Sequence, residues 1–154
     1  MPMPEINDVA IVKGEQISNT ISGNISSEIL LNLSKRVNHL LNEGKQQGVV
    51  ITHGTDTIEE TAFFLELTTQ NKQPIVIVGA MRPANRYQCR MNCFASYFLL
   101  VDKKAENRGV LNDRIGLLLY HQSKPTTPDA FKSYEPGYLG VFVSGPKFYY
   151  STAC

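Results

Sequence analysis

The sequence contains no tryptophan, carries almost no net charge and has no apolar run that approaches the length of a membrane span. Its 15 lysines and arginines against 14 aspartates and glutamates give a formal net charge of +1, without a long block of one sign. Proteins that bind nucleic acid or membrane surfaces through charge need a basic patch, so nothing here indicates either partner. The 154 residues, 42% of them hydrophobic, suit a single domain that buries its own core.

Cysteine is also scarce. Cys89, Cys93 and Cys154 are an odd number outside any recognised disulfide framework, so free thiols in a reducing compartment are expected. Cys89 and Cys93 are spaced like two metal ligands, but none of the three histidines is close to them in the sequence, and we predict no metal site. The N-terminus has neither the basic nor the apolar segment of a secretory signal. We therefore expect a cytoplasmic protein, with a periplasmic location left open for a full-length relative.

The strongest structural signal is a strand, a turn and a helix in succession. The uncharged, β-branched run at residues 49–52 predicts a buried strand, and Gly54 interrupts it. The apolar periodicity of residues 57–70 then predicts a helix, and the run at residues 75–79 predicts a second buried strand. A strand, helix and strand in this order form a βαβ unit with two parallel strands. The fold class indicated is therefore α/β.

The turn of this unit holds the most interesting polar residues. Thr55 and Asp56 lie at the carboxyl end of the first strand, where open α/β sheets place their ligand sites. Thr57 and Glu60 have the spacing of an N-terminal capping box. When no family resemblance is considered, a Thr-Asp pair in such a turn usually serves only to cap the helix, because both residue types favour helix starts.

The remaining patterns extend the α/β prediction along the chain. Ser26 or Ser27 can cap a helix that an apolar stripe predicts, and Gly44 suits its end. The other predicted elements are listed in order: helices at residues 24–44 and 91–104, strands at residues 109–111 and 117–120, and a C-terminal β-hairpin of residues 139–143 and 148–150.

Several motifs resemble those of one enzyme family. The stretch THGTDTIEET at residues 52–61 resembles the H-G-T-D-T-x-E-E-[TS] signature of the L-asparaginase/glutaminase family. VGAMRPA at residues 78–84 is similar to the family's V-G-A-M-R-P segment, and Asp102 and Lys103 precede an NRG tail of the family's kind. The resemblance covers nearly all of this chain but not all of the family's chain. It implies a three-layer, parallel, flavodoxin- or Rossmann-like sheet.

The resemblance also implies roles for four residues. A threonine hydroxyl attacks an amide only when a base takes its proton, and a lysine serves as that base when burial lowers its pKa. In the family, residues that match Thr55 and Lys103 form this pair, and the match to Asp56 contacts the substrate's α-ammonium. Ser22 ends a GEQxxNxxS stretch and matches the contact to the α-carboxylate. No metal or organic cofactor is implied.

Two family segments have no counterpart in this sequence. Family members begin with a glycine-rich stretch that carries the primary threonine nucleophile, and no GGTI motif occurs here. They also continue into a smaller C-terminal domain, which closes the active site of a neighbouring subunit in a homo-tetramer. Residues 1–154 are thus expected to be a single, partial N-terminal α/β domain, truncated at both ends and inactive or nearly so by itself. The segments that flank Lys103 are also shorter than in the family.

The function implied is hydrolysis of L-asparagine, and in some members L-glutamine, to the acid and ammonia. Small-molecule L-asparagine or L-aspartate is then the only partner expected besides further copies of the chain. The alternative is a non-catalytic product, either a truncated remnant or a weak amino-acid-binding or interaction module. A nucleotide-binding domain is disfavoured because the turn after residues 49–52 has no glycine-rich phosphate loop.

Overall fold

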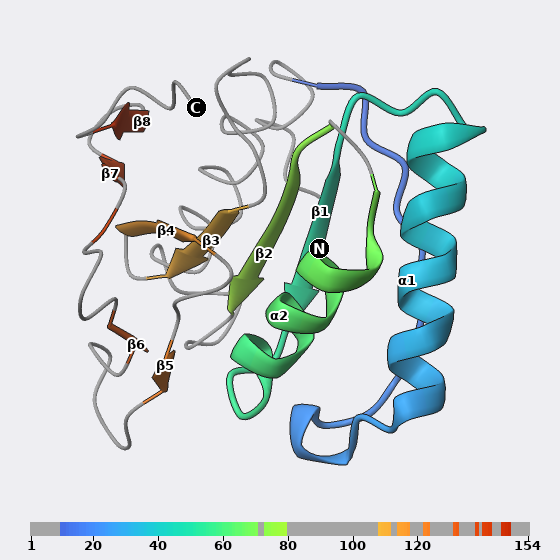
Figure 1. Ribbon diagram of the computed structural model, residues 1–154, viewed down its shortest axis with the longest axis horizontal. Coiled ribbons are helices and arrows are strands. Elements are labelled where there is room, and N and C mark those ends of the chain that lie inside the picture. The colour runs from blue at the N-terminus through green and yellow to red at the C-terminus, as the bar shows by residue number, and fades with distance from the viewer. Residues whose placement is uncertain are drawn as a thin grey trace.

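The computed structural model describes residues 10–70, 73–79, 108–111, 114–117, 122–123, 131–132, 138, 140–142 and 146–148 (Figure 1). These residues form a 3₁₀ turn, η2 (Ser22–Asn24), two helices and eight strands. The helices are α1 (Ser27–Asn42) and α2 (Ile58–Thr68). The strands are β1 (Val49–His53), β2 (Ile75–Gly79), β3 (Arg108–Leu111), β4 (Arg114–Leu117), β5 (Gln122–Ser123), β6 (Phe131–Lys132), β7 (Gly140–Phe142) and β8 (Pro146–Phe148).

Six strands form one sheet in the order β1-β2-β3-β4-β7-β8, and β5 and β6 pair separately. β1, β2 and β3 run parallel, and β4, β7 and β8 are antiparallel to their neighbours. α2 connects β1 to β2, so the predicted βαβ unit is confirmed, with Val49 opposite Ile75 and His53 opposite Gly79. The α/β class is confirmed with it, while the three layers and the C-terminal hairpin stay predictions.

The boundaries of some elements differ from those predicted. α1 begins later than residue 24, because Ser22–Asn24 form a 3₁₀ turn and the extended Ser26 is the N-cap, whose hydroxyl accepts the amide of Ile29 at 3.4 Å. β4 begins before residue 117, because its antiparallel pairing with β3 reaches back to Arg114. The helix predicted at residues 91–104 lies outside the described residues.

The core lies between the two helices and the parallel strands. α2 buries Ile58, Thr61, Ala62 and Leu65, and β2 is buried at every position, as is typical of a strand with neighbours on both sides. One cluster of buried side chains joins α1, α2 and β2: Leu33, Val37, Leu41, Leu65 and Ile75, with Val49 and Ile51 packed against it.

Polar contacts also fix α1 against α2. The hydroxyl of the buried Ser34 donates to Thr68 Oγ1 at 2.8 Å, and Thr68 Oγ1 donates to the carbonyl of Phe64 at 2.7 Å. The amide of Asn38 donates to the carbonyls of Ser34 and Thr68 at 3.0 and 3.1 Å. Hydroxyls that would be costly to bury alone are therefore paired across the helix contact.

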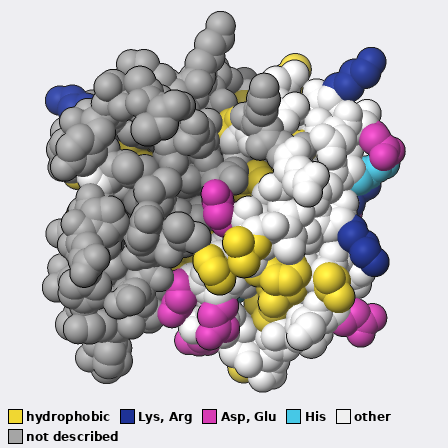
Figure 2. Space-filling model, viewed as in Figure 1, with side chains coloured by type: hydrophobic (Ala, Val, Ile, Leu, Met, Phe, Trp, Pro, Cys, Tyr) yellow, Lys and Arg dark blue, Asp and Glu magenta, His cyan; other side chains and the backbone are white. Residues whose placement is uncertain are grey.

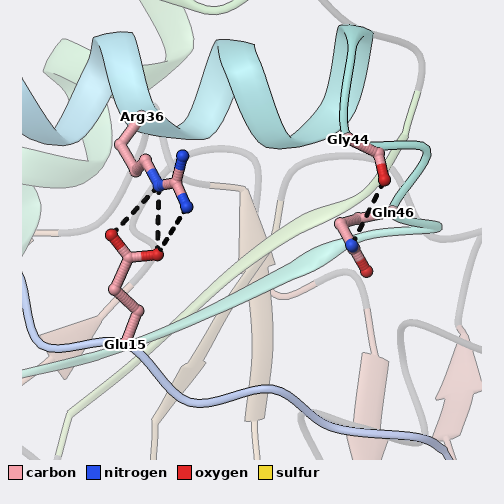
Figure 3. A network of polar contacts seen from close by, with 4 residues as sticks. All are labelled: Glu15, Arg36, Gly44 and Gln46. Atoms are coloured by element: carbon pink, nitrogen blue, oxygen red, sulfur yellow. Dashed lines mark hydrogen bonds and ion pairs between the residues drawn. The ribbon is translucent and has the colours of Figure 1, made fainter.

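The segment that precedes η2 runs beside α1 and is anchored to it by an ion pair (Figures 1 and 3). Both carboxylate oxygens of Glu15 accept from Arg36, at 2.8 and 3.0 Å. Figure 3 also shows the end of α1, where the side chain of Gln46 donates to the carbonyl of Gly44 at 3.3 Å. The anchored segment leads directly to Ser22, which belongs to the site described below.

The surface shows hydrophobic side chains over α2 and the adjoining half of α1 (Figure 2). The large hydrophobic residues exposed on these two helices are Leu31, Phe63 and Leu67. Neither helix that the structure describes combines the length and the apolar character needed to span a membrane.

Candidate active site

The candidate site is built where β1 ends and α2 begins. β1 ends at His53 and α2 begins at Ile58, so Gly54, Thr55, Asp56 and Thr57 form the connecting turn. This turn lies at the carboxyl end of a parallel strand, as the sequence predicts. Thr55 and Thr57 are half-buried and Asp56 is exposed, so these polar residues remain accessible to a ligand.

Ser22 packs directly against this turn, although it precedes it by more than 30 residues. Its hydroxyl donates to Asp56 Oδ2 at 2.9 Å and accepts the backbone amide of Asp56 at 3.2 Å. The Ser22 side chain is buried, with 7% of its surface exposed. Two of the predicted substrate contacts, one on each segment, are therefore in direct contact with each other.

Two further contacts hold Ser22 in place. The hydroxyl of Thr57 donates to the Ser22 carbonyl at 2.8 Å. Gly54 lies so close that a Cβ built on it would meet Ser22 Cβ at 2.8 Å and Ser22 Oγ nearer still. The glycine is thus required by space, because any side chain at position 54 would push Ser22 away from the turn.

The capping box predicted for Thr57 and Glu60 is wrong. Thr57 is the N-cap residue of α2, but its side chain makes no capping hydrogen bond. The hydroxyl is used instead on the Ser22 carbonyl. A contact to a distant segment has replaced the local one, and no spacing rule within residues 52–61 could have indicated it.

His53 stabilises the turn through hydrogen bonds at both of its ring nitrogens. Its Nδ1 contacts the carbonyl of Gly54, which can only accept, so Nδ1 carries a proton. In the neutral ring Nε2 is then an acceptor, and the hydroxyl of the buried Thr61 donates to it at 2.9 Å. Both ring nitrogens are used within the turn and α2, which gives this histidine a structural role in the turn.

The start of α2 concentrates negative charge near Asp56. Glu59 and Glu60 occupy the first turn of the helix, where carboxylates stabilise the positive end of the helix dipole. Three acidic residues thus follow Thr55 within a short stretch, which suits a ligand that carries an ammonium group. Lys103, the predicted base, lies outside the described residues, as do Cys89 and Cys93.

A groove of about 400 Å³ runs along β1 next to the site. Its apolar wall comes from α1 and β1, and its polar wall includes Lys13 and Glu15. The groove reaches Thr52, His53 and Thr61, and its lining does not include Ser22, Thr55 or Asp56. Within the described sheet β1 pairs only with β2, so the groove follows a strand edge that has no neighbour there.

Comparison with known proteins gives a consistent result. The family model "Asparaginase, N-terminal" matches residues 1–153. L-asparaginase 2 of Bacillus subtilis is 46% identical over 145 residues, which are 90% of this chain and 39% of the relative. The glutaminase-asparaginase of Pseudomonas aeruginosa is 39% identical over 155 residues, 96% of this chain and 42% of the relative.

A solved structure agrees with these sequences. The crystal structure of a probable cytoplasmic L-asparaginase from Campylobacter jejuni has a TM-score of 0.89 and 39% sequence identity to this chain. The similarity covers 97% of this chain and 48% of that one. The chain therefore spans less than half the length of these relatives.

Proposed function

This chain belongs to the asparaginase family, and from that membership we propose that Ser22, Thr55 and Asp56 form part of a site for hydrolysis of the side-chain amide of L-asparagine. Asp56 accepts from the substrate's α-ammonium, Ser22 donates to its α-carboxylate, and Thr55 presents the hydroxyl that attacks the amide or activates water. L-Glutamine is a second candidate substrate, since one relative is a glutaminase-asparaginase.

The observation that carries this proposal is the contact between Ser22 and Asp56. The hydroxyl of Ser22 and the carboxylate of Asp56 are 2.9 Å apart, and the Asp56 amide points at the same hydroxyl. The hydroxyl proposed to contact the α-carboxylate and the carboxylate proposed to accept from the α-ammonium therefore lie side by side. Ser22 has one hydroxyl proton and donates it to Asp56 here, so the hydroxyl has to turn from Asp56 to the substrate's carboxylate on binding. Such a pair suits a free amino acid better than a peptide, whose amino and carboxyl groups are blocked.

Lys103 is the proposed base. It would take the proton of the attacking hydroxyl, since an unassisted threonine hydroxyl is a weak nucleophile at neutral pH. The sequence has no glycine-rich GGTI segment, which carries the primary threonine nucleophile in the family. We therefore propose that the 154 residues bind the amino acid but hydrolyse asparagine slowly or not at all by themselves.

The wider architecture is proposed on the same basis. These residues form a single, partial N-terminal domain of the family's three-layer α/β fold, with a C-terminal β-hairpin. No metal and no organic cofactor takes part. The cytoplasm is the proposed location, in agreement with the description of the Campylobacter jejuni structure.

The first test is binding of L-aspartate, the reaction product, by isothermal titration calorimetry. Saturable binding is expected, and Asp56→Asn is expected to weaken it by about 10- to 100-fold, because a hydrogen bond to a charged group is worth about 1.5–3 kcal/mol. Glu60→Gln is the matched control, since it removes an exposed carboxylate from the same helix start. Equal affinity of the wild type and Asp56→Asn would contradict the proposed site.

The second test separates binding from chemistry. Ammonia release from L-asparagine by the 154-residue chain is expected not to exceed that of a Thr55→Val variant. Release that disappears in Thr55→Val would show instead that Thr55 acts as the nucleophile without the missing segment. A folded circular dichroism spectrum for both proteins is the control.

Among the described strands β1 has a neighbour on one side only, and this edge favours a second candidate function, an interaction module without catalysis. The groove along β1 is lined by Val49, Val50 and Ile51, and β1 carries no charged residue that would discourage pairing with another strand. Aspartate binding without ammonia release is expected for both candidates, so concentration-dependent self-association in sedimentation experiments is the result that would favour this one. Absence of aspartate binding and weak amide protection would favour a remnant without function.

A further inference from the structure

We propose that Thr57 is a positioning residue for substrate binding, which acts by holding Ser22 against the turn. The inference rests on the proposed function and adds a residue to that site. It begins from an exception: Thr57 occupies the N-cap of α2 and makes no capping hydrogen bond. The matched residue of α1, Ser26, does cap its helix through the amide of Ile29. A helix N-terminus without a side-chain cap is less stable, so the hydroxyl that does not cap it is expected to make another favourable contact.

The gain lies in the contact with Ser22. The Thr57 hydroxyl donates to the Ser22 carbonyl at 2.8 Å, while the Ser22 hydroxyl meets Asp56 on the other side of the same residue. Ser22 belongs to a short 3₁₀ turn, which has few internal hydrogen bonds to fix it. Thr57 therefore links the backbone of this turn to the Thr55–Asp56 turn and sets the direction in which the Ser22 hydroxyl points.

The contribution of Thr57 can be separated from the stability of the fold. The Ser22 carbonyl also accepts the amide of Ile25 at 3.2 Å, so it keeps a partner when the threonine hydroxyl is removed. Because Thr57 makes no cap, Thr57→Val removes no capping bond from α2. Valine has nearly the shape of threonine, so the variant mainly loses one donor.

The test compares two ligands on Thr57→Val. L-Aspartate carries the α-carboxylate that Ser22 would contact, and its α-amide does not. We expect the dissociation constant for L-aspartate to rise about tenfold, the loss typical of one hydrogen bond, and that for the α-amide to change less than about twofold. Thr57→Ser, which keeps the hydroxyl, restores the wild-type affinity, and Ser26→Ala, which removes a true cap, leaves the ratio of the two constants unchanged.

A purely structural role for Thr57 would weaken both ligands equally, and that result would overturn the proposal. So would an affinity of Thr57→Val for L-aspartate within about twofold of the wild type. If the wild type binds no L-aspartate, the proposed function is wrong, and amide hydrogen exchange decides the positioning role by itself. The Asp56 amide, which donates to Ser22 Oγ at 3.2 Å, is expected to exchange about tenfold faster in Thr57→Val. Unchanged exchange would overturn the inference.

Discussion

Leu65→Ala is expected to lower the free energy of unfolding by about 2–5 kcal/mol, the range for removing a large aliphatic side chain from a packed core. Leu65 is 0% exposed and joins α2 to the buried residues of α1 and β2. Truncation leaves a cavity at the point where all three elements meet. Since small domains are stable by only about 5–15 kcal/mol, the variant is expected to lose a large part of its folded population in mild denaturant. Urea unfolding followed by circular dichroism measures the change.

The same helix offers a matched control. Leu67 is 66% exposed, and Leu67→Ala removes the same atoms from the opposite face of α2. Its effect is expected to stay within about 0.5 kcal/mol, as for surface substitutions generally. A loss for Leu65→Ala no larger than that for Leu67→Ala would mean that α2 does not pack as described.

The sequence predicted the parts of the fold that depend on local pattern. The uncharged runs of β1 and β2 and the periodicity of α2 correctly indicated a parallel βαβ unit. The pattern could not separate α1 from the 3₁₀ turn before it, because Ser22–Asn24 contains no apolar residue whose position would show where the helical periodicity begins. Strand limits such as that of β4 depend on pairing with another strand, which a single segment does not encode.

The candidate site was predicted only in part for a related reason. The sequence pattern places Thr55 and Asp56 at the carboxyl end of β1, where α/β sheets bind ligands. The two residues alone do not identify a catalytic site, because both residue types also favour helix starts. Ser22 came from the family resemblance, since 34 residues separate it from Asp56 and no periodicity connects them. The link through Thr57 was missed because capping statistics describe the usual local choice, and here a contact with a distant segment was more favourable. The position of Lys103 stays a prediction.

Gly54→Ala is expected to weaken L-aspartate binding more than about tenfold and to cost about 1–3 kcal/mol of stability, as overpacking does. The added Cβ would lie 2.8 Å from Ser22 Cβ and nearer to Ser22 Oγ. Ser22 cannot easily give way, because Asp56 and Thr57 hold its side chain and its carbonyl. The two segments must therefore separate, and the donor for the α-carboxylate moves away from the acceptor for the α-ammonium. Calorimetry and urea unfolding measure the two effects.

Gly23→Ala is the control, since a Cβ at that position meets only Asp56 Oδ2, at the ordinary contact distance of 3.9 Å. A sharper check combines Gly54→Ala with Ser22→Gly, which removes the atoms that the new methyl group would meet. Because the two residues share one space, their effects on stability are not expected to add, and the double variant should be more stable than Gly54→Ala alone. Its affinity should not return, because the Ser22 hydroxyl is gone. Recovery of both stability and binding would show that the site does not need Ser22, and that the glycine is required for packing only.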